Sequence, residues 1–238
     1  MQLVPLDPPE PVEAAQVRRA PAPKAVERKR MTGLERREQL ILVGRRLFAE
    51  LGYESVTVEA IASAAKVSKP VVYEHFAGVE IDGKEFGTKE ALYAVIVDRE
   101  IAELLHAIQS GLDASHPRLM IEQSVMALLT YIERNDEGFQ ILVRDSPVGM
   151  AGNFSNLMAD IAVRVQHLLA REFKARGLNP KLAPLYAQSL VGMIALTGQW
   201  WLDARRPGKQ EVAAHIVNLA WHGLQGLERD PKLIGKFD

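Results

Sequence analysis

Apolar residues recur at spacings of three and four along most of the chain beyond residue 31, a pattern that predicts helices. The first predicted helix begins near Thr32, a plausible N-cap, and ends at Gly52. A second helix follows Thr57. A third, short helix follows Ser68, with Pro70 in its first turn, where a missing N–H is harmless. Two short helices joined by so tight a turn predict helix-turn-helix geometry.

The remainder of the chain is predicted to be helical as well. Its periodic segments run near 89–111, 117–135, 137–145, 154–177, 180–206 and 209–227. One segment departs from this pattern, because the alternating arms of residues 79–86 flank Asp82-Gly83, a dipeptide that favours a type I′ hairpin turn. An irregular loop is the alternative for this segment. The predicted fold class is all-α, with a three-helix helix-turn-helix domain, a larger helical domain and an inserted short β-hairpin at 79–86.

The first 30 residues are predicted to form a disordered arm. They hold six of the thirteen prolines, no aromatic residue and no periodic apolar pattern. The end of this arm is basic, and such arms can lie in a DNA minor groove or act only as solubilising tails. The N-terminus has neither the basic nor the apolar region of a signal peptide, so a cytoplasmic protein is expected.

Residues 182–202 carry no charge and have about the length that crosses a bilayer. Gln188 and Gln199 lie within this segment, and buried amides are costly in lipid. We therefore interpret it as a helix buried on nearly all sides by protein, in a large bundle or at a subunit interface. A membrane span is the alternative.

Composition and charge narrow the class of protein. The chain of 238 residues is 47% hydrophobic and 25% charged, as in globular proteins, and the absence of cysteine excludes disulfides, thiol catalysis and Cys-ligated metals. Residues 18–76 hold twelve Lys/Arg against seven Asp/Glu, although the whole chain has a net charge of −1. This basic section indicates a polyanionic partner, with a merely solvated basic face as the alternative.

Motifs of enzymes are missing from the sequence. It has no Gly-x-Ser-x-Gly, no phosphate-binding glycine-rich loop and no His-Glu-x-x-His. Glu-x-x-His pairs on two helices, which a metal-binding bundle needs, are also missing. We expect no enzymatic activity, no metal and no cofactor.

Residues 41–93 resemble the DNA-binding domain of the tetracycline-repressor (TetR) family. The matching residues are Leu47-Phe48-x-x-x-Gly52-Tyr53, Thr57-Val58-x-x-Ile61-Ala62, Val67-Ser68-Lys69-x-x-Val72-Tyr73-x-His75-Phe76 and Lys89-Glu90-Ala91-Leu92-Tyr93. The resemblance implies a homodimer whose third helix enters the major groove of an operator, under the control of a small-molecule effector. It divides the chain into the arm at 1–30, a DNA-binding domain at 31–96 and a ligand-binding and dimerisation domain at 97–238.

The resemblance also implies which side chains contact DNA. Base edges would be met by the exposed start of the third helix, which carries Ser68, Lys69, Pro70 and Val71. Phosphates would be met by Thr57, Tyr73, His75 and Lys89. The alternatives are a core-edge role for Tyr73 and a helix-capping role for His75.

The chain departs from the family between Phe76 and Lys89. Twelve residues separate the two, where family members usually have two, and the predicted hairpin accounts for the excess. Lys84 in this hairpin could contact the DNA backbone, or the insertion could be inert.

The larger domain is rich in Met and aromatic residues, which suits an apolar ligand, although most of these side chains must form core. The candidate pocket residues are Leu105, Ile108, Met126, Leu129, Phe139, Leu142, Met158, Ile161, Val165 and Trp200. The stretch 190–203 is similar to actinobacterial TetR-type regulators of lipid metabolism, which implies a long-chain acyl or acyl-CoA effector.

Two stripes are predicted to form the dimer interface. The residues concerned are Gly192, Ala195 and Gly198 on one helix and Val212, Ile216, Leu219 and Gly223 on the last, with His215 and His222 beside the second stripe. The resulting hypothesis is a dimeric, sequence-specific DNA-binding transcriptional regulator, a repressor in the first instance. The alternative is a helical small-molecule-binding protein without specific DNA readout.

Overall fold

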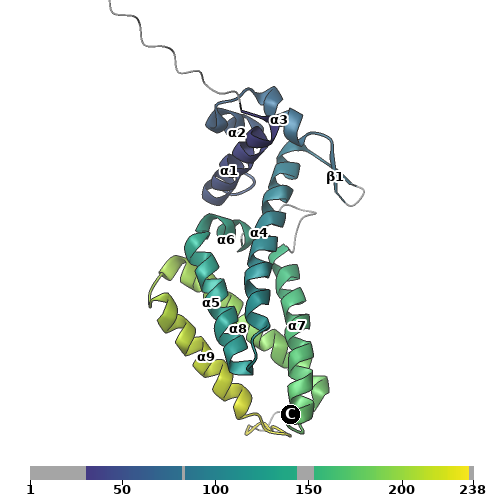
Figure 1. The fold of residues 1–238 in the computed structure, drawn as a ribbon, viewed down its shortest axis with the longest axis vertical. Coiled ribbons are helices and arrows are strands. Elements are labelled where there is room, and N and C mark those ends of the chain that lie inside the picture. Colours follow the sequence, from purple (N-terminus) through teal and green to yellow (C-terminus); the bar gives the residue numbers. More distant parts are fainter. Residues whose placement is uncertain (1–30, 82–83, 144–152, 236–238) are drawn as a thin grey trace, which may run out of the picture.

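The computed structural model describes residues 31–81, 84–143 and 153–235. Its elements are α1 (Gly33–Leu51), α2 (Val58–Ala65), α3 (Lys69–Phe76), β1 (Val79–Ile81), β2 (Lys84–Phe86), α4 (Thr88–Leu112), α5 (Pro117–Arg134), α6 (Asp136–Val143), α7 (Asn153–Ala175), the 3-10 turn η1 (Pro180–Leu182), α8 (Ala183–Ala204) and α9 (Lys209–Gln225). Helices α1 to α3 form a head, and α4 runs from this head along a body made of α5 and α7 to α9 (Figure 1). The short helix α6 lies where head and body meet.

The head begins and turns at the predicted capping residues. The Thr32 side chain accepts a hydrogen bond from Glu35 N, while the Glu35 carboxylate accepts one from Thr32 N, so a complete capping box starts α1. Thr57 caps α2 by accepting from Ala60 N at 3.1 Å. Ser68 holds the N-cap position of α3, but its side chain makes no capping hydrogen bond. The hydroxyl of Ser68 is therefore not used to start the helix.

A small apolar core holds α2 and α3 in place. Ile61, Val72 and Phe76 are completely buried, and Ala65 almost so. The small residues of α2 allow close packing, and Lys66 in the left-handed conformation (φ 56°) ends the helix. The tight turn between α2 and α3 then sets the first turn of α3 on the outside of the head.

The helices of the body follow the predicted segments with small shifts. The predicted helix at 180–206 begins as the 3-10 turn η1, where Asn179 accepts from Lys181 N, and α8 ends at Arg205 in the left-handed conformation (φ 54°). The predicted helix at 137–145 corresponds to α6, and residues 144 and 145 lie outside the described part of the chain. Within the described residues, no helix is long and apolar enough to cross a membrane.

Two short strands follow the head. β1 and β2 pair antiparallel, with Val79 opposite Phe86 and Ile81 opposite Lys84. They project beside the start of α4 (Figure 1). Asp82 and Gly83 lie outside the described residues, so their type I′ turn stays a prediction.

Helix α8 is covered by its own chain on one face only, so one chain does not bury it on nearly all sides, and its burial at a subunit interface stays a prediction. Its inward face includes Ala187 and Ala195, both buried. On its outward face Leu185 is 61% exposed, Leu196 65% and Trp200 53%. A single chain therefore leaves an apolar stripe of α8 uncovered.

Candidate nucleic-acid interface and apolar cavity

The first turn of α3 is the exposed part of the helix-turn-helix. Ser68, Lys69 and Pro70 are exposed and Val71 is half-buried, whereas Val72 is fully buried. This split follows from the packing of α3 on the head, which leaves its N-terminal end free to approach another surface. The arrangement matches the requirement for side chains that reach base edges.

Lys69 has a partner within the head. Its Nζ forms an ion pair with Glu59 Oε1 of α2 and lies 5.6 Å from the centre of the Tyr73 ring. This contact raises the pKa of Lys69 and lowers the pKa of the Glu59 carboxyl. Both side chains are exposed, so Lys69 can leave Glu59 at little cost when an acceptor on a base is offered.

The predicted phosphate contacts occupy different environments. Tyr73 is 40% exposed, and both its phosphate contact and its core-edge alternative stay predictions. His75 is half-buried and its ring lies 6.5 Å from that of Phe76. Thr57 is exposed at the N-terminus of α2, a position that favours an anion, and its hydroxyl oxygen already accepts a hydrogen bond from Ala60 N.

Lys89 is held inside the head rather than offered outward. Its Nζ donates to the backbone carbonyl of Tyr53 at 3.1 Å and lies 4.0 Å from the centre of the Tyr53 ring. The Tyr53 ring in turn packs against Tyr93 at 4.9 Å, and burial raises the pKa of Tyr53. Lys89 thus ties the start of α4 to the head, and its phosphate contact stays a prediction. The side chain of Lys84 and the arm at 1–30 lie outside the described part of the structure.

An apolar cavity of about 160 Å³ lies between α4, α5, α7 and α8. Ser124, at the crossing of α5 with α4, places a buried Oγ there that has no hydrogen-bond partner among the residues that the structure describes. Arg171 and Glu172 are the charged residues of the lining, and both are exposed. The cavity therefore offers a mostly apolar interior with its charged groups toward solvent.

Four of the predicted pocket residues line this cavity: Ile108, Met158, Ile161 and Val165. Leu105, Leu129, Phe139 and Leu142 pack in the core without lining it, and Met126 lies in an open groove between α4 and α5. Trp200 points outward, so its assignment to the pocket is wrong. The sequence prediction missed the lining residues Leu112, Met120, Ile121, Ser124, Leu128, Leu190, Val191, Ile194 and Ala195.

The residues of the two predicted dimer stripes fall into two groups, one buried within the chain and one exposed. Ala195 and Gly198 are buried within the chain, and a Cβ on Gly198 would lie 3.0 Å from Leu128 of α5. Val212 and Ile216 of α9 are buried as well, and α9 packs on α5. These four residues are occupied by their own chain, which corrects their assignment to a partner interface.

The other members of the predicted stripes remain open. A Cβ on Gly192 or Gly223 would meet nothing within 4 Å, and Leu219 is 64% exposed. Gly192 lies on the same face of α8 as Leu185, Leu196 and Trp200, at helical spacings of seven, four and eight residues.

Comparison with protein-family models gives two matches along the chain. Residues 40–79 match "Bacterial regulatory proteins, tetR family", and residues 117–223 match "Tetracyclin repressor-like, C-terminal domain". The chain belongs to the TetR family. It is a DNA-binding transcription regulator with a helix-turn-helix and a ligand-binding domain, as the sequence resemblance implies.

Individual relatives agree with this assignment. The chain is 27% identical over 195 residues to the HTH-type transcriptional activator FasR of Mycolicibacterium smegmatis, covering 80% of this chain and 83% of the relative. The fatty acid degradation regulator FadR from Bacillus halodurans has a TM-score of 0.62 at 17% identity, covering 83% of this chain and 99% of its own. AibR in complex with isovaleryl coenzyme A and operator DNA has a TM-score of 0.59 at 18% identity, covering 78% and 97%. At these identities the two structures show a shared fold.

Proposed function

We propose that this TetR-family regulator binds a two-fold operator as a homodimer, through the first turn of α3, under the control of an apolar effector. The observation that carries the proposal is the exposed start of α3, where Ser68 and Lys69 stand clear of the core on a basic section of chain. We further propose the division into an arm at 1–30, a DNA-binding domain at 31–96 and a ligand-binding and dimerisation domain at 97–238, and a cytoplasmic location.

Lys69 is the proposed base-reading residue, and Glu59 restrains it. Lys69→Ala should lower operator affinity by about tenfold or more and change the preferred sequence, because a good base contact discriminates by that much. Glu59→Gln should raise affinity for all sequences, because it removes a carboxylate near phosphate and frees Lys69. Binding to an operator library, measured for both variants beside Arg118→Ala on the exposed start of α5, tests the assignment. An unchanged preference in Lys69→Ala would contradict it.

The proposed effector is a long-chain acyl group, free or as acyl-CoA. The cavity supports this class because its interior is apolar and its exposed Arg171 can face an anionic head. The names of similar structures point the same way, since one is a fatty acid degradation regulator and another holds isovaleryl coenzyme A. These are properties of those proteins, and here they motivate the choice of probe.

Palmitoyl-CoA should stabilise the protein against heat, by about 2.7 kcal/mol at a hundred times its dissociation constant. Ile161→Trp fills the cavity and should abolish this stabilisation. Val163→Trp, two residues away on the exposed face of α7, should leave it intact. Equal stabilisation of both variants in a thermal-unfolding assay would show that the cavity is not the site.

The proposed dimer surface is the exposed stripe of α8 with the outward residues of α9. Leu185, Gly192, Leu196 and Trp200 line one face of α8, and Leu219 with Gly223 lies outward on α9. Exposed apolar side chains at this density favour association with a second copy.

Repression is the proposed outcome of operator binding. The relative FasR is named an activator. Transcription in vitro from a promoter that carries the operator distinguishes repression from activation.

A further inference from the structure

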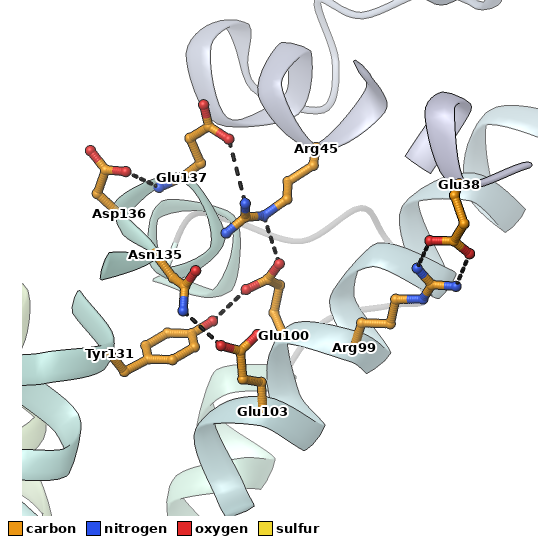
Figure 2. Close-up of polar contacts among 9 residues, drawn as sticks. All are labelled: Glu38, Arg45, Arg99, Glu100, Glu103, Tyr131, Asn135, Asp136 and Glu137. Atoms are coloured by element: carbon orange, nitrogen blue, oxygen red, sulfur yellow. Dashed lines mark hydrogen bonds and ion pairs between the residues drawn. The ribbon is translucent and has the colours of Figure 1, made fainter. Parts of the chain in front are cut away.

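A buried carboxylate lies at the junction of head and body. Glu100 of α4 is only 5% exposed. Arg45 of α1 places its Nε 2.7 Å from Glu100 Oε1, and the Tyr131 hydroxyl of α5 donates to Glu100 Oε2 at 2.5 Å (Figure 2). We call Arg45, Glu100 and Tyr131 the junction cluster. One carboxylate is thus contacted by a helix of the head and by a helix of the effector domain.

Helix α6 closes over this cluster. A Cβ on Gly138 would lie 1.9 Å from Glu100 Oε2 and 2.9 Å from Arg45 Nη2, so the backbone of α6 lies directly against the ion pair. Glu137 of the same helix places Oε2 3.7 Å from Arg45 Nη1 (Figure 2). The Arg45 side chain therefore extends from α1 of the head to a position between the carboxylates of Glu100 on α4 and Glu137 on α6.

The cluster is sensitive to displacement because a buried charge depends on its partners. Burial and the contact with Glu100 both raise the pKa of Tyr131, so the hydroxyl keeps its proton and remains a donor to the carboxylate. A movement of α5 that withdraws this hydroxyl leaves Glu100 with Arg45 alone, and the favoured position of Arg45 then changes.

Two helices that line the apolar cavity, α5 and α7, are connected to Tyr131. On α5, Leu128 lines the cavity and precedes Tyr131 by one turn. On α7, Met158 lines the cavity one turn after Phe154, whose ring lies 5.7 Å from that of Phe139. The ring of Phe139 lies 6.3 Å from that of Tyr131. Both helices that a ligand in the cavity would spread, α5 and α7, are thus connected to Tyr131, α5 because it carries this residue and α7 through the rings of Phe154 and Phe139.

We propose that Glu100 is the positioning residue that couples the cavity to the DNA-binding head. The junction cluster holds the head in one orientation, and filling of the cavity changes that orientation by shifting Tyr131 away from Glu100. The second half of this inference rests on the proposed effector site, whereas the first half does not.

Because the chain has no cysteine, two introduced cysteines can carry spin labels without interference. Ser63→Cys on α2 and Glu122→Cys on α5 are both at exposed positions, one in the head and one in the body. Pulsed electron paramagnetic resonance, with labelled chain diluted in excess unlabelled chain, gives the distance distribution between them. The doubly labelled parent should show one narrow distribution.

Tyr131→Phe, which removes a single oxygen atom, and Glu100→Gln should each shift or broaden this distribution. The matched control is Arg99→Gln, because Arg99 pairs with Glu38 at 2.6 and 2.7 Å between the same helices α1 and α4, but on the exposed side (Figure 2). The control should leave the distribution unchanged. A merely structural role would show as lost helicity, so circular dichroism accompanies each variant.

Rescue gives a second, independent readout. Arg45→Gln/Glu100→Gln leaves no buried charge without a partner, because the remaining carboxylate of Glu137 is 40% exposed, and it pairs two amides, so it should restore a narrow distribution relative to Glu100→Gln. Unchanged distributions in Tyr131→Phe and Glu100→Gln would overturn the assignment. Absence of rescue in the double variant would equally contradict a pairwise contact.

The coupling half is tested on the same labelled proteins with palmitoyl-CoA. The parent distribution should shift on addition of this probe, and the Glu100→Gln distribution should not shift further. A parent that binds palmitoyl-CoA without any shift would refute the coupling. If the parent does not bind the probe at all, the proposed effector is wrong, while the variants without ligand still decide whether the junction cluster orients the head.

Discussion

Replacing Leu196 with arginine should give a folded monomer whose affinity for a two-fold operator is lower by about a hundredfold or more. Leu196 is 65% exposed at the centre of the apolar stripe of α8, so the charge costs nothing in a single chain but meets the partner in a dimer. Two linked heads gain about 10²–10⁴ in affinity over one, and a monomer loses that gain. Sedimentation velocity and a mobility-shift titration measure the two effects.

Two further variants make this result specific. Val163→Arg introduces the same charge at a 52% exposed apolar position on α7 and should leave both dimer and affinity intact. Ala195→Arg, which is 5% exposed and lines the cavity, should instead destabilise the fold. A Leu196→Arg protein that remains dimeric with normal operator affinity would remove the α8 stripe from the interface.

Gly138→Ala should destabilise the protein, although the same change usually strengthens a helix. Alanine in a helix interior is worth about 1 kcal/mol over glycine. Here the added Cβ would lie 1.9 Å from Glu100 Oε2, and overpacking of this kind costs about 1–3 kcal/mol. We expect a lower free energy of unfolding in urea, together with weaker operator binding, because α6 must move from the junction cluster.

Gly33→Ala is the control for this variant. Gly33 is exposed at the first position of α1, and a Cβ there would meet no atom of the described residues within 4 Å. Its free energy of unfolding should be unchanged or slightly raised. If Gly138→Ala were as stable as Gly33→Ala, α6 could move away from Glu100 without loss of stability, and its close packing against that carboxylate would not be needed.

Local signals account for what the sequence predicted well. Thr32 and Thr57 are caps whose function depends on neighbours three residues away, and Gly52 ends α1 with a positive φ of 76°. The helix-turn-helix could be assigned because its spacings are short and because they match a family pattern. Contacts of this range are encoded in a few consecutive residues.

Which neighbour covers a helical stripe could not be predicted in this way. Ala195 and Gly198 form a stripe of small residues, but periodicity does not say whether α5 of the same chain or a helix of a second chain packs on it. Trp200 and Trp201 are adjacent and point about 100° apart on a helix of 3.6 residues per turn. Only the fold shows that Trp201 is buried and that Trp200 is exposed.

One member of the junction cluster, Glu100, can be recognised in the sequence as a charged residue at an apolar position of a helix. Glu100 lies four residues from Ile96 and four from Leu104, both of which are buried, so its charge falls on the apolar face of α4. A charged residue on such a face needs a partner, and this spacing could have identified it. Its partners Arg45 and Tyr131, however, are 55 and 31 residues away in sequence, and only the folded chain brings them together.

The most direct test of operator recognition by a dimer is selection of bound duplexes from a random DNA library by the wild-type protein. We expect enrichment of one inverted repeat with half-sites about one helical turn apart or more, bound by two copies of the chain. The Lys69→Ala protein should enrich a different or weaker repeat from the same library. Recovery of duplexes with no common sequence, or of a single half-site bound by one chain, would contradict recognition of a two-fold operator by a dimer.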